Sequence, residues 1–177
     1  MSERNNRHLA SGIVAGIAGG LVASWLMNEF IVNLGPQLQK AVQGEDAVNQ
    51  QQPQGDEKPD DATMKTADAV VSTVTGGQHL SHEEKEKGGP VVHYAFGALM
   101  GAAYGAAAEA LPETTFGFGT AFGAALFTGA DLVAVPALNL SGSPSDAPVS
   151  TLATPFAAHL VYGVATEAVR RLVRAIL

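Results

Sequence analysis

Three ionisable side chains lie alone inside long apolar stretches of this sequence. His93 and His159 each begin the same pattern of His, two residues, an aromatic residue and Gly, and Asp131 lies in a third apolar stretch. Two imidazoles beside a carboxylate can relay protons near neutral pH or bind a divalent metal ion. They can also bond to neighbouring helices and hold a fold together, which is the interpretation we favour. No two of these residues lie four apart on one helix, so we predict neither a metal site nor another cofactor.

A second set of charges lies near the end of the chain. Glu167 precedes Arg170 and Arg171 by three and four residues, which is the favourable order for ion pairs on one helix. Glu109 closes another apolar stretch and could share these arginines. The alternatives are that each charge reaches the membrane interface alone, or that the arginines meet anionic lipid headgroups.

The stretches that carry these residues are long enough to cross a bilayer. No Asp, Glu, Lys or Arg occurs from Gly88 to Ala108, and about 20 apolar residues span the hydrocarbon core. We therefore predict an all-α integral membrane protein, a four-helix bundle in one domain over residues 1–177. The expected spans are about 9–30, 89–111, 116–138 and 151–170.

Small residues recur at every fourth position within these spans. Residues four apart lie on one stripe of a helix, and glycines there let a second backbone approach closely, as in a glycine zipper. The predicted packing positions are Gly12, Gly16, Gly20, Gly97, Gly101, Gly105, Gly119, Gly123 and Gly163.

A long polar loop is expected between the first two spans, over residues 35–88. Gly35-Pro36 should end the first helix, and residues 43–61 are rich in Gln, Asp and Pro, which favours disorder. Apolar residues then recur at helical spacing, which predicts a short amphipathic helix over 62–75, either at the membrane surface or folded over the end of the bundle. Ser81 and Glu84 fit a capping box, and Pro90 suits the first turn of the second span.

The positive charges near the span ends predict the orientation. Two arginines precede the first span and three end the chain, whereas the 139–150 turn has none. This favours both termini in the cytoplasm. At about 1.5 Å per residue, the same threading places His93, Asp131, His159 and Glu29 together in the outer half of the membrane.

Composition excludes several classes of function. A net charge of −7 does not suit a nucleic-acid-binding protein, and the absence of cysteine excludes disulfides and thiol chemistry. No nucleophile turn or phosphate-binding loop occurs, so we do not expect an enzyme. The expected partners are the lipid bilayer and other copies of the chain.

Four stretches carry a resemblance to a known family. They read ATMKTADAV (62–70), HLSHEEKEKGGPVVHYAFGALMGAAYG (79–105), GADLVAVPALNLS (129–141) and AAHLVYGVATEAVRRLV (157–173). With them the chain resembles the YagU-like family of bacterial inner-membrane proteins, a domain of unknown function. The resemblance implies about four helices in the inner membrane and a role in acid tolerance, and it implies no catalytic residues.

Two hypotheses of function follow. The first is a non-enzymatic membrane protein of this type, a structural or acid-stress component that self-associates. The alternative is a small transporter or proton-conducting unit that uses His93, Asp131 and His159. A soluble bundle of Gly/Ala helices is a third interpretation of the same pattern.

Overall fold

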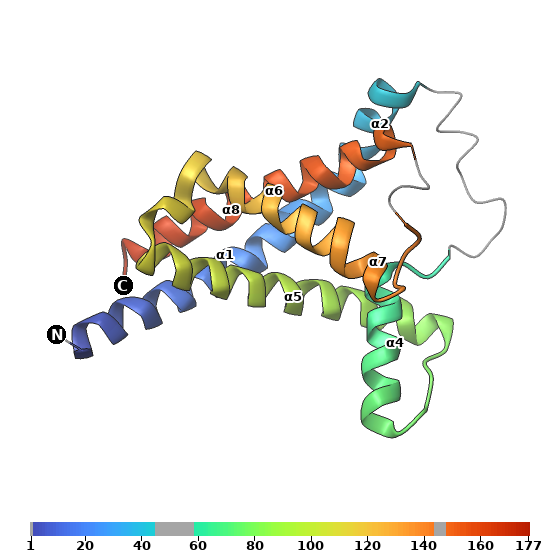
Figure 1. The fold of residues 1–177 in the computed structure, drawn as a ribbon, viewed down its shortest axis with the longest axis horizontal. Helices are drawn as coiled ribbons and strands as arrows, with labels where there is room; N and C mark the ends of the chain where they lie inside the picture. Colours follow the sequence, from blue (N-terminus) through green and yellow to red (C-terminus); the bar gives the residue numbers. More distant parts are fainter. Residues whose placement is uncertain (1, 45–58, 144–147) are drawn as a thin grey trace.

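The computed structural model describes residues 2–44, 59–143 and 148–177. Every regular element within these ranges is helical, which confirms the all-α prediction. Three helical segments are long and apolar enough to cross a membrane: Arg7–Asn33, His82–Ala110 and Pro112–Ala137. Figure 1 shows the long helices lying side by side, with both chain termini at one end of the molecule.

Helices α1 (Ser2–Asn33) and α5 (His82–Ala110) are antiparallel and touch backbone to backbone. The facing residues along this interface are Gly12, Gly16 and Gly20 on α1 and Gly97, Gly101 and Gly105 on α5. A Cβ atom added at Gly16 would overlap the carbonyl group of Gly101, and one added at Gly101 would lie 2.8 Å from Cα of Gly20. The absence of side chains therefore sets the distance between these two helices.

The other two long segments form a second pair of the same kind. The third segment begins with the 3-10 helix η1 (Pro112–Gly119) and continues as α6 (Thr120–Leu126), the π-helix η2 (Phe127–Ala134) and α7 (Val135–Ala137). Its α6 part packs against α8 (Ala153–Arg174). Gly119 and Gly163 face each other, and Gly123 lies against the backbone of His159. Each predicted packing glycine thus lies against a neighbouring helix.

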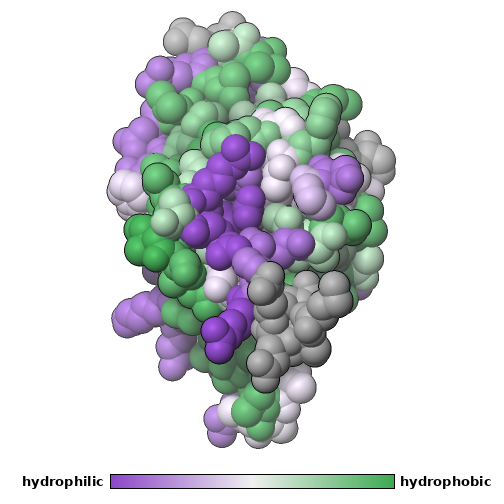
Figure 2. All heavy atoms as spheres, turned by 90° about the vertical axis from the view of Figure 1, so that its left-hand side faces the viewer, coloured by the Kyte–Doolittle hydropathy of each residue, from purple (hydrophilic) through white to green (hydrophobic). Residues whose placement is uncertain are grey.

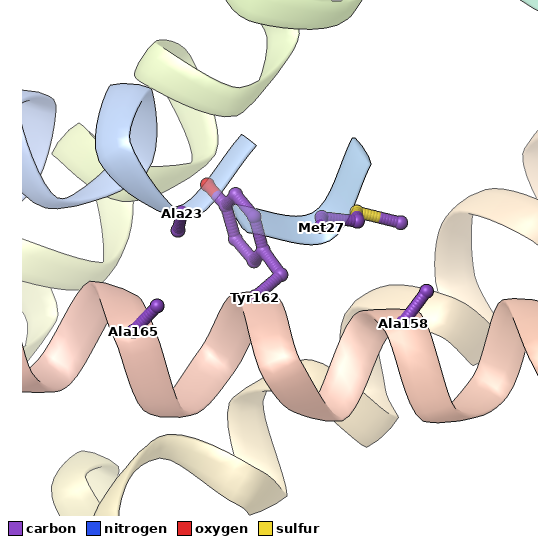
Figure 3. Packing of buried hydrophobic residues seen from close by; sticks show 5 residues of the cluster. All are labelled: Ala23, Met27, Ala158, Tyr162 and Ala165. Atoms are coloured by element: carbon purple, nitrogen blue, oxygen red, sulfur yellow. The ribbon is translucent and has the colours of Figure 1, made fainter. Parts of the chain in front are cut away.

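The two pairs are joined through α1 and α8. Figure 3 shows Ala23 and Met27 of α1 beside Ala158, Tyr162 and Ala165 of α8, with the Tyr162 ring directed toward α1. The Tyr162 hydroxyl donates to the carbonyl oxygen of Gly97 on α5 at 2.6 Å, so one side chain links three helices.

The elements that flank the long helices correct two expectations. Gly35-Pro36 does not lead into a loop, because Pro36 lies in the first turn of a further helix, α2 (Gly35–Gln43). Pro90 is inside α5 and not in its first turn, because the capping box of Ser81 and Glu84, which is present as predicted, starts the helix at His82.

The helix expected over residues 62–75 is α4 (Ala62–Thr75), which Asp61 caps and which ends at Gly76, a residue with a left-handed backbone conformation. The predicted Gln-rich disordered stretch falls mainly on residues 45–58, which lie outside the described residues. In Figure 1, α4 runs across the direction of α5 at the end of the molecule opposite the termini. The short elements η1 (Pro112–Gly119) and η4 (Val149–Leu152) complete the chain at the two ends of the bundle.

Candidate functional site

The largest group of buried charges lies at the end of the bundle that holds the termini. Glu167 is fully buried and accepts hydrogen bonds from Arg170 (Nε–Oε2 2.8 Å, Nη2–Oε1 3.1 Å) and from Arg171 (Nε–Oε1 2.6 Å). Glu109 on α5 accepts from Arg174 at 2.7 and 3.1 Å, and Arg170 Nη1 lies 3.5 Å from Glu109 Oε1. The structure thus contains the predicted pairing of Glu167 with Arg170 and Arg171, while Glu109 shares Arg170 and pairs more closely with Arg174. We call these five residues the charge cluster.

Aromatic residues complete the charge cluster. The Tyr104 hydroxyl donates to Glu167 Oε2 at 2.9 Å, and Arg170 lies 6.0 Å from the Tyr104 ring centroid. Arg171 lies 4.8 Å from the centroid of Phe118, in the turn between α5 and α6. Figure 2, which views this end of the molecule, shows hydrophilic residues gathered in the middle with hydrophobic residues around them. The charge cluster and these two rings join α5 and α8 by hydrogen bonds, and α8 and the turn after α5 by a cation–π contact.

A second, smaller polar contact joins the third segment to α8. His159 Nδ1 lies 3.7 Å from Asp131 Oδ2 and 2.9 Å from the carbonyl oxygen of Pro155, which accepts its hydrogen bond. The His159 side chain is buried, whereas that of Asp131 is about one third exposed. Asp131 lies within the π-helix η2, a form that is rare and often occurs at functional sites.

The two other members of the predicted outer cluster make contacts elsewhere. His93 Nε2 lies 3.3 Å from the carbonyl oxygen of Ser24 on α1, and Glu29 accepts a hydrogen bond from Asn33 on its own helix. The equal depth predicted for these residues does not bring their side chains together, because depth does not fix the direction in which each points around its helix. The predicted cluster of four is thus a pair, Asp131 and His159.

A metal site finds no support in these contacts. Within the described ranges, no three His, Asp or Glu side chains come together in a way that could hold a metal ion. What the Asp131–His159 pair can do chemically is bind or pass a proton, or act as a polar link between two helices.

Three residues in or beside the charge cluster were not found from the sequence. The sequence-based predictions include no contact for Tyr104, Arg174 or His8. Arg174 Nη2 lies 3.4 Å from His8 Nδ1, which ties the start of α1 to the same arginine that binds Glu109. The signal for Arg174 was available, since it lies seven residues after Glu167 and therefore on the same face of the helix. Tyr104 carries no such signal in the sequence.

A third polar group links α4 to the start of α5. Asp60 lies 2.9 Å from Lys85 Nζ and 2.8 Å from His82 Nδ1, and Asp68 lies 2.9 Å from His79 Nδ1 and accepts from the Leu80 amide. The hydrogen bond from Lys85 lowers the pKa of Asp60 below its ordinary value. The bond with His79, and then the one from the Leu80 amide, lowers the pKa of Asp68.

Comparison with known proteins adds a family. The sequence model of a family described as "Protein of unknown function (DUF1440)" matches residues 52–168, which is more than half of the chain. No curated protein and no solved structure matches this chain.

Proposed function

The chain belongs to this family of unknown function, DUF1440, and we propose that it is a non-enzymatic membrane protein with a structural role. In this proposal α8 crosses the membrane beside the three apolar segments and completes a four-helix bundle, and the loop between the first two spans lies outside. The observation that carries the structural role is the backbone contact at the glycines of both helix pairs. Such contacts act as a glycine zipper and leave no space for a polar solute between the paired helices.

The charges support the same role. Each carboxylate of the charge cluster is bound by arginines, and Tyr104 occupies a further position on Glu167. Groups that are paired in this way hold helices together, because separating them would leave buried charges without partners.

The orientation that we propose places both termini in the cytoplasm of a bacterium and the protein in the inner membrane. The support is that the two termini share one end of the molecule, and that Arg7 near the start of α1 and Arg170, Arg171 and Arg174 near the end of α8 are close to them in the chain. Reporter fusions at residue 177 and in the 139–150 turn test it. The proposal requires opposite sides of the membrane for the two fusions, and the same side for both excludes it.

The resemblance to the YagU-like family supports a link to acid stress, which we propose on that ground alone. Self-association through small-residue faces is a separate part of the proposal. A strain that lacks the protein should survive acid exposure less well than its parent, and the wild-type gene should restore survival. Equal survival of the two strains excludes the acid-stress role.

A second candidate is proton conduction, which the pairing of a partly exposed Asp131 with a buried His159 favours. The two functions are separated by measuring proton flux into proteoliposomes with an entrapped pH dye, together with unfolding in detergent. For a structural protein, wild type should conduct no faster than empty vesicles, and Asp131→Asn and His159→Gln should only lower stability. Flux in wild type that is lost in Asp131→Asn, with stability unchanged, refutes the structural role.

A further inference from the structure

We propose that α4 lies on the lipid bilayer at the end of the bundle opposite the termini, with the face formed by Thr66, Val70, Thr73 and Val74 in contact with lipid. This inference rests on the proposal that α5 crosses the membrane. It adds an interaction surface outside the four-helix core, with the interfacial region of the bilayer as its partner.

One side of α4 is fixed to the protein. Met64 and Ala67 are buried, and they lie against Gly89 and Gly88 at the start of α5. Asp68 is held on the same side by His79 and the Leu80 amide. These contacts determine the rotation of α4 about its axis, and therefore which face points away from α5.

The opposite face is uncharged. At about 100° per residue, Thr66 and Val70 lie roughly 160° and 200° around the helix from Asp68. The side chains of Val70 and Val74 are exposed, with relative accessibilities of 54% and 81%. An exposed, uncharged face that carries apolar side chains is what a helix in the interface of a membrane presents to lipid.

The polar atoms of this face are already satisfied. The Thr66 hydroxyl donates to the carbonyl of Ala62, and the Thr73 hydroxyl donates to the carbonyl of Ala69, both at 2.7 Å. Each threonine therefore satisfies its hydroxyl within its own helix. Such a surface loses no hydrogen bond to the protein when it is placed against acyl chains, which is the condition for contact with lipid.

The position of α4 continues the surface that would face lipid. Lys65 Nζ donates to the carbonyl of Leu140 at 3.0 Å, so α4 lies beside the end of the third apolar segment. Leu138 on that segment and Val91 on α5 have relative accessibilities of 67% and 69%, so exposed apolar side chains reach this level. In Figure 1, α4 runs across the direction of α5, which is along the membrane surface if α5 crosses the membrane.

The absence of cysteine in the protein makes the test direct, because each variant carries a single thiol. Nitroxide labels are placed at Val70→Cys and Val74→Cys in the full chain, reconstituted in vesicles of phosphatidylethanolamine and phosphatidylglycerol. Gln78→Cys, exposed in the turn after α4, is the control in water, and Leu99→Cys, exposed on α5, is the control in lipid. Collision of each label with oxygen and with a water-soluble nickel chelate is then measured.

Contact with lipid requires high oxygen and low nickel accessibility at residues 70 and 74, as at residue 99, with nickel accessibility several-fold below that at residue 78. Nickel accessibility equal to that at residue 78 overturns the inference, and so does low accessibility to both reagents, which indicates protein contact with a second copy. Because Leu99 tests the membrane span separately, its exposure to nickel refutes the membrane proposal as a whole, whereas failure at α4 alone leaves that proposal intact.

Discussion

Replacement of Gly101 by Ala should destabilise the protein, because the added methyl group has no room between α1 and α5. The Cβ atom would overlap the carbonyl of Gly16 and lie 2.8 and 2.9 Å from the Cα and N atoms of Gly20, all of which are backbone atoms that cannot rotate away. Overpacking of this kind costs about 1–3 kcal/mol. The higher helix propensity of Ala relative to Gly offsets at most about 1 kcal/mol of this cost. After subtraction of that offset, we expect a net loss of up to about 2 kcal/mol in the free energy of unfolding.

The chain offers a matched control for this substitution. Gly129 lies in the third apolar segment, has no left-handed backbone angle and has no atom within 4 Å of an added Cβ. Gly129→Ala should therefore be neutral or slightly stabilising. The assay is unfolding of the two variants by sodium dodecyl sulfate in mixed micelles, followed by circular dichroism. Equal midpoints for Gly101→Ala and Gly129→Ala would falsify the claim that glycine contacts set the helix distance.

Three further outcomes are expected. Tyr104→Phe removes one donor from buried Glu167 and should cost about 1–2 kcal/mol in the same unfolding assay; an unchanged midpoint contradicts this. Glu167→Ala leaves Arg170 buried without its nearest carboxylate and should cost more, about 3–5 kcal/mol, so a smaller loss than that of Tyr104→Phe refutes the order. Asp68 has a folded-state pKa below its ordinary 3.8, so its contribution is present above that pH and is lost as the pH falls through the folded value. The protection factors of the amides of residues 62–75, which compare the exchange rate with that of the unfolded chain at the same pH, should accordingly fall below pH 3.8 in wild type and lose that pH dependence in Asp68→Asn.

The sequence predicted the helices and the glycine contacts because both follow from local periodicity. Four-residue spacing assigns Gly12, Gly16 and Gly20 to one face whatever the rest of the fold is, and two such faces have few other ways to pack. The pairing of Glu167 with Arg170 was predictable for the same reason, since both lie on one helix within one turn.

The predicted outer cluster failed because it was built from depth alone, and depth does not fix the direction of a side chain around its helix. Depth along the membrane normal placed His93 and Asp131 at one level, but the rotation of α5 directs His93 to the backbone of Ser24. That rotation is fixed by the glycine stripe, because Gly97 on the same stripe must face α1. The π-helix around Asp131 likewise has no signal in the sequence, since it depends on tertiary packing.

The glycine contacts and the charge cluster belong to one arrangement. A Cβ atom added at Gly12 would overlap the Cγ atom of Glu109, and one added at Gly119 would lie 3.1 Å from Cβ of Glu167. Glycine at these two positions therefore makes room for the carboxylates that bind the arginines. The small residues bring the helices close and also allow two acidic side chains to fit between them, so loss of either feature weakens the other. This coupling explains why buried charges are tolerated at an end of the bundle where the helices approach so closely.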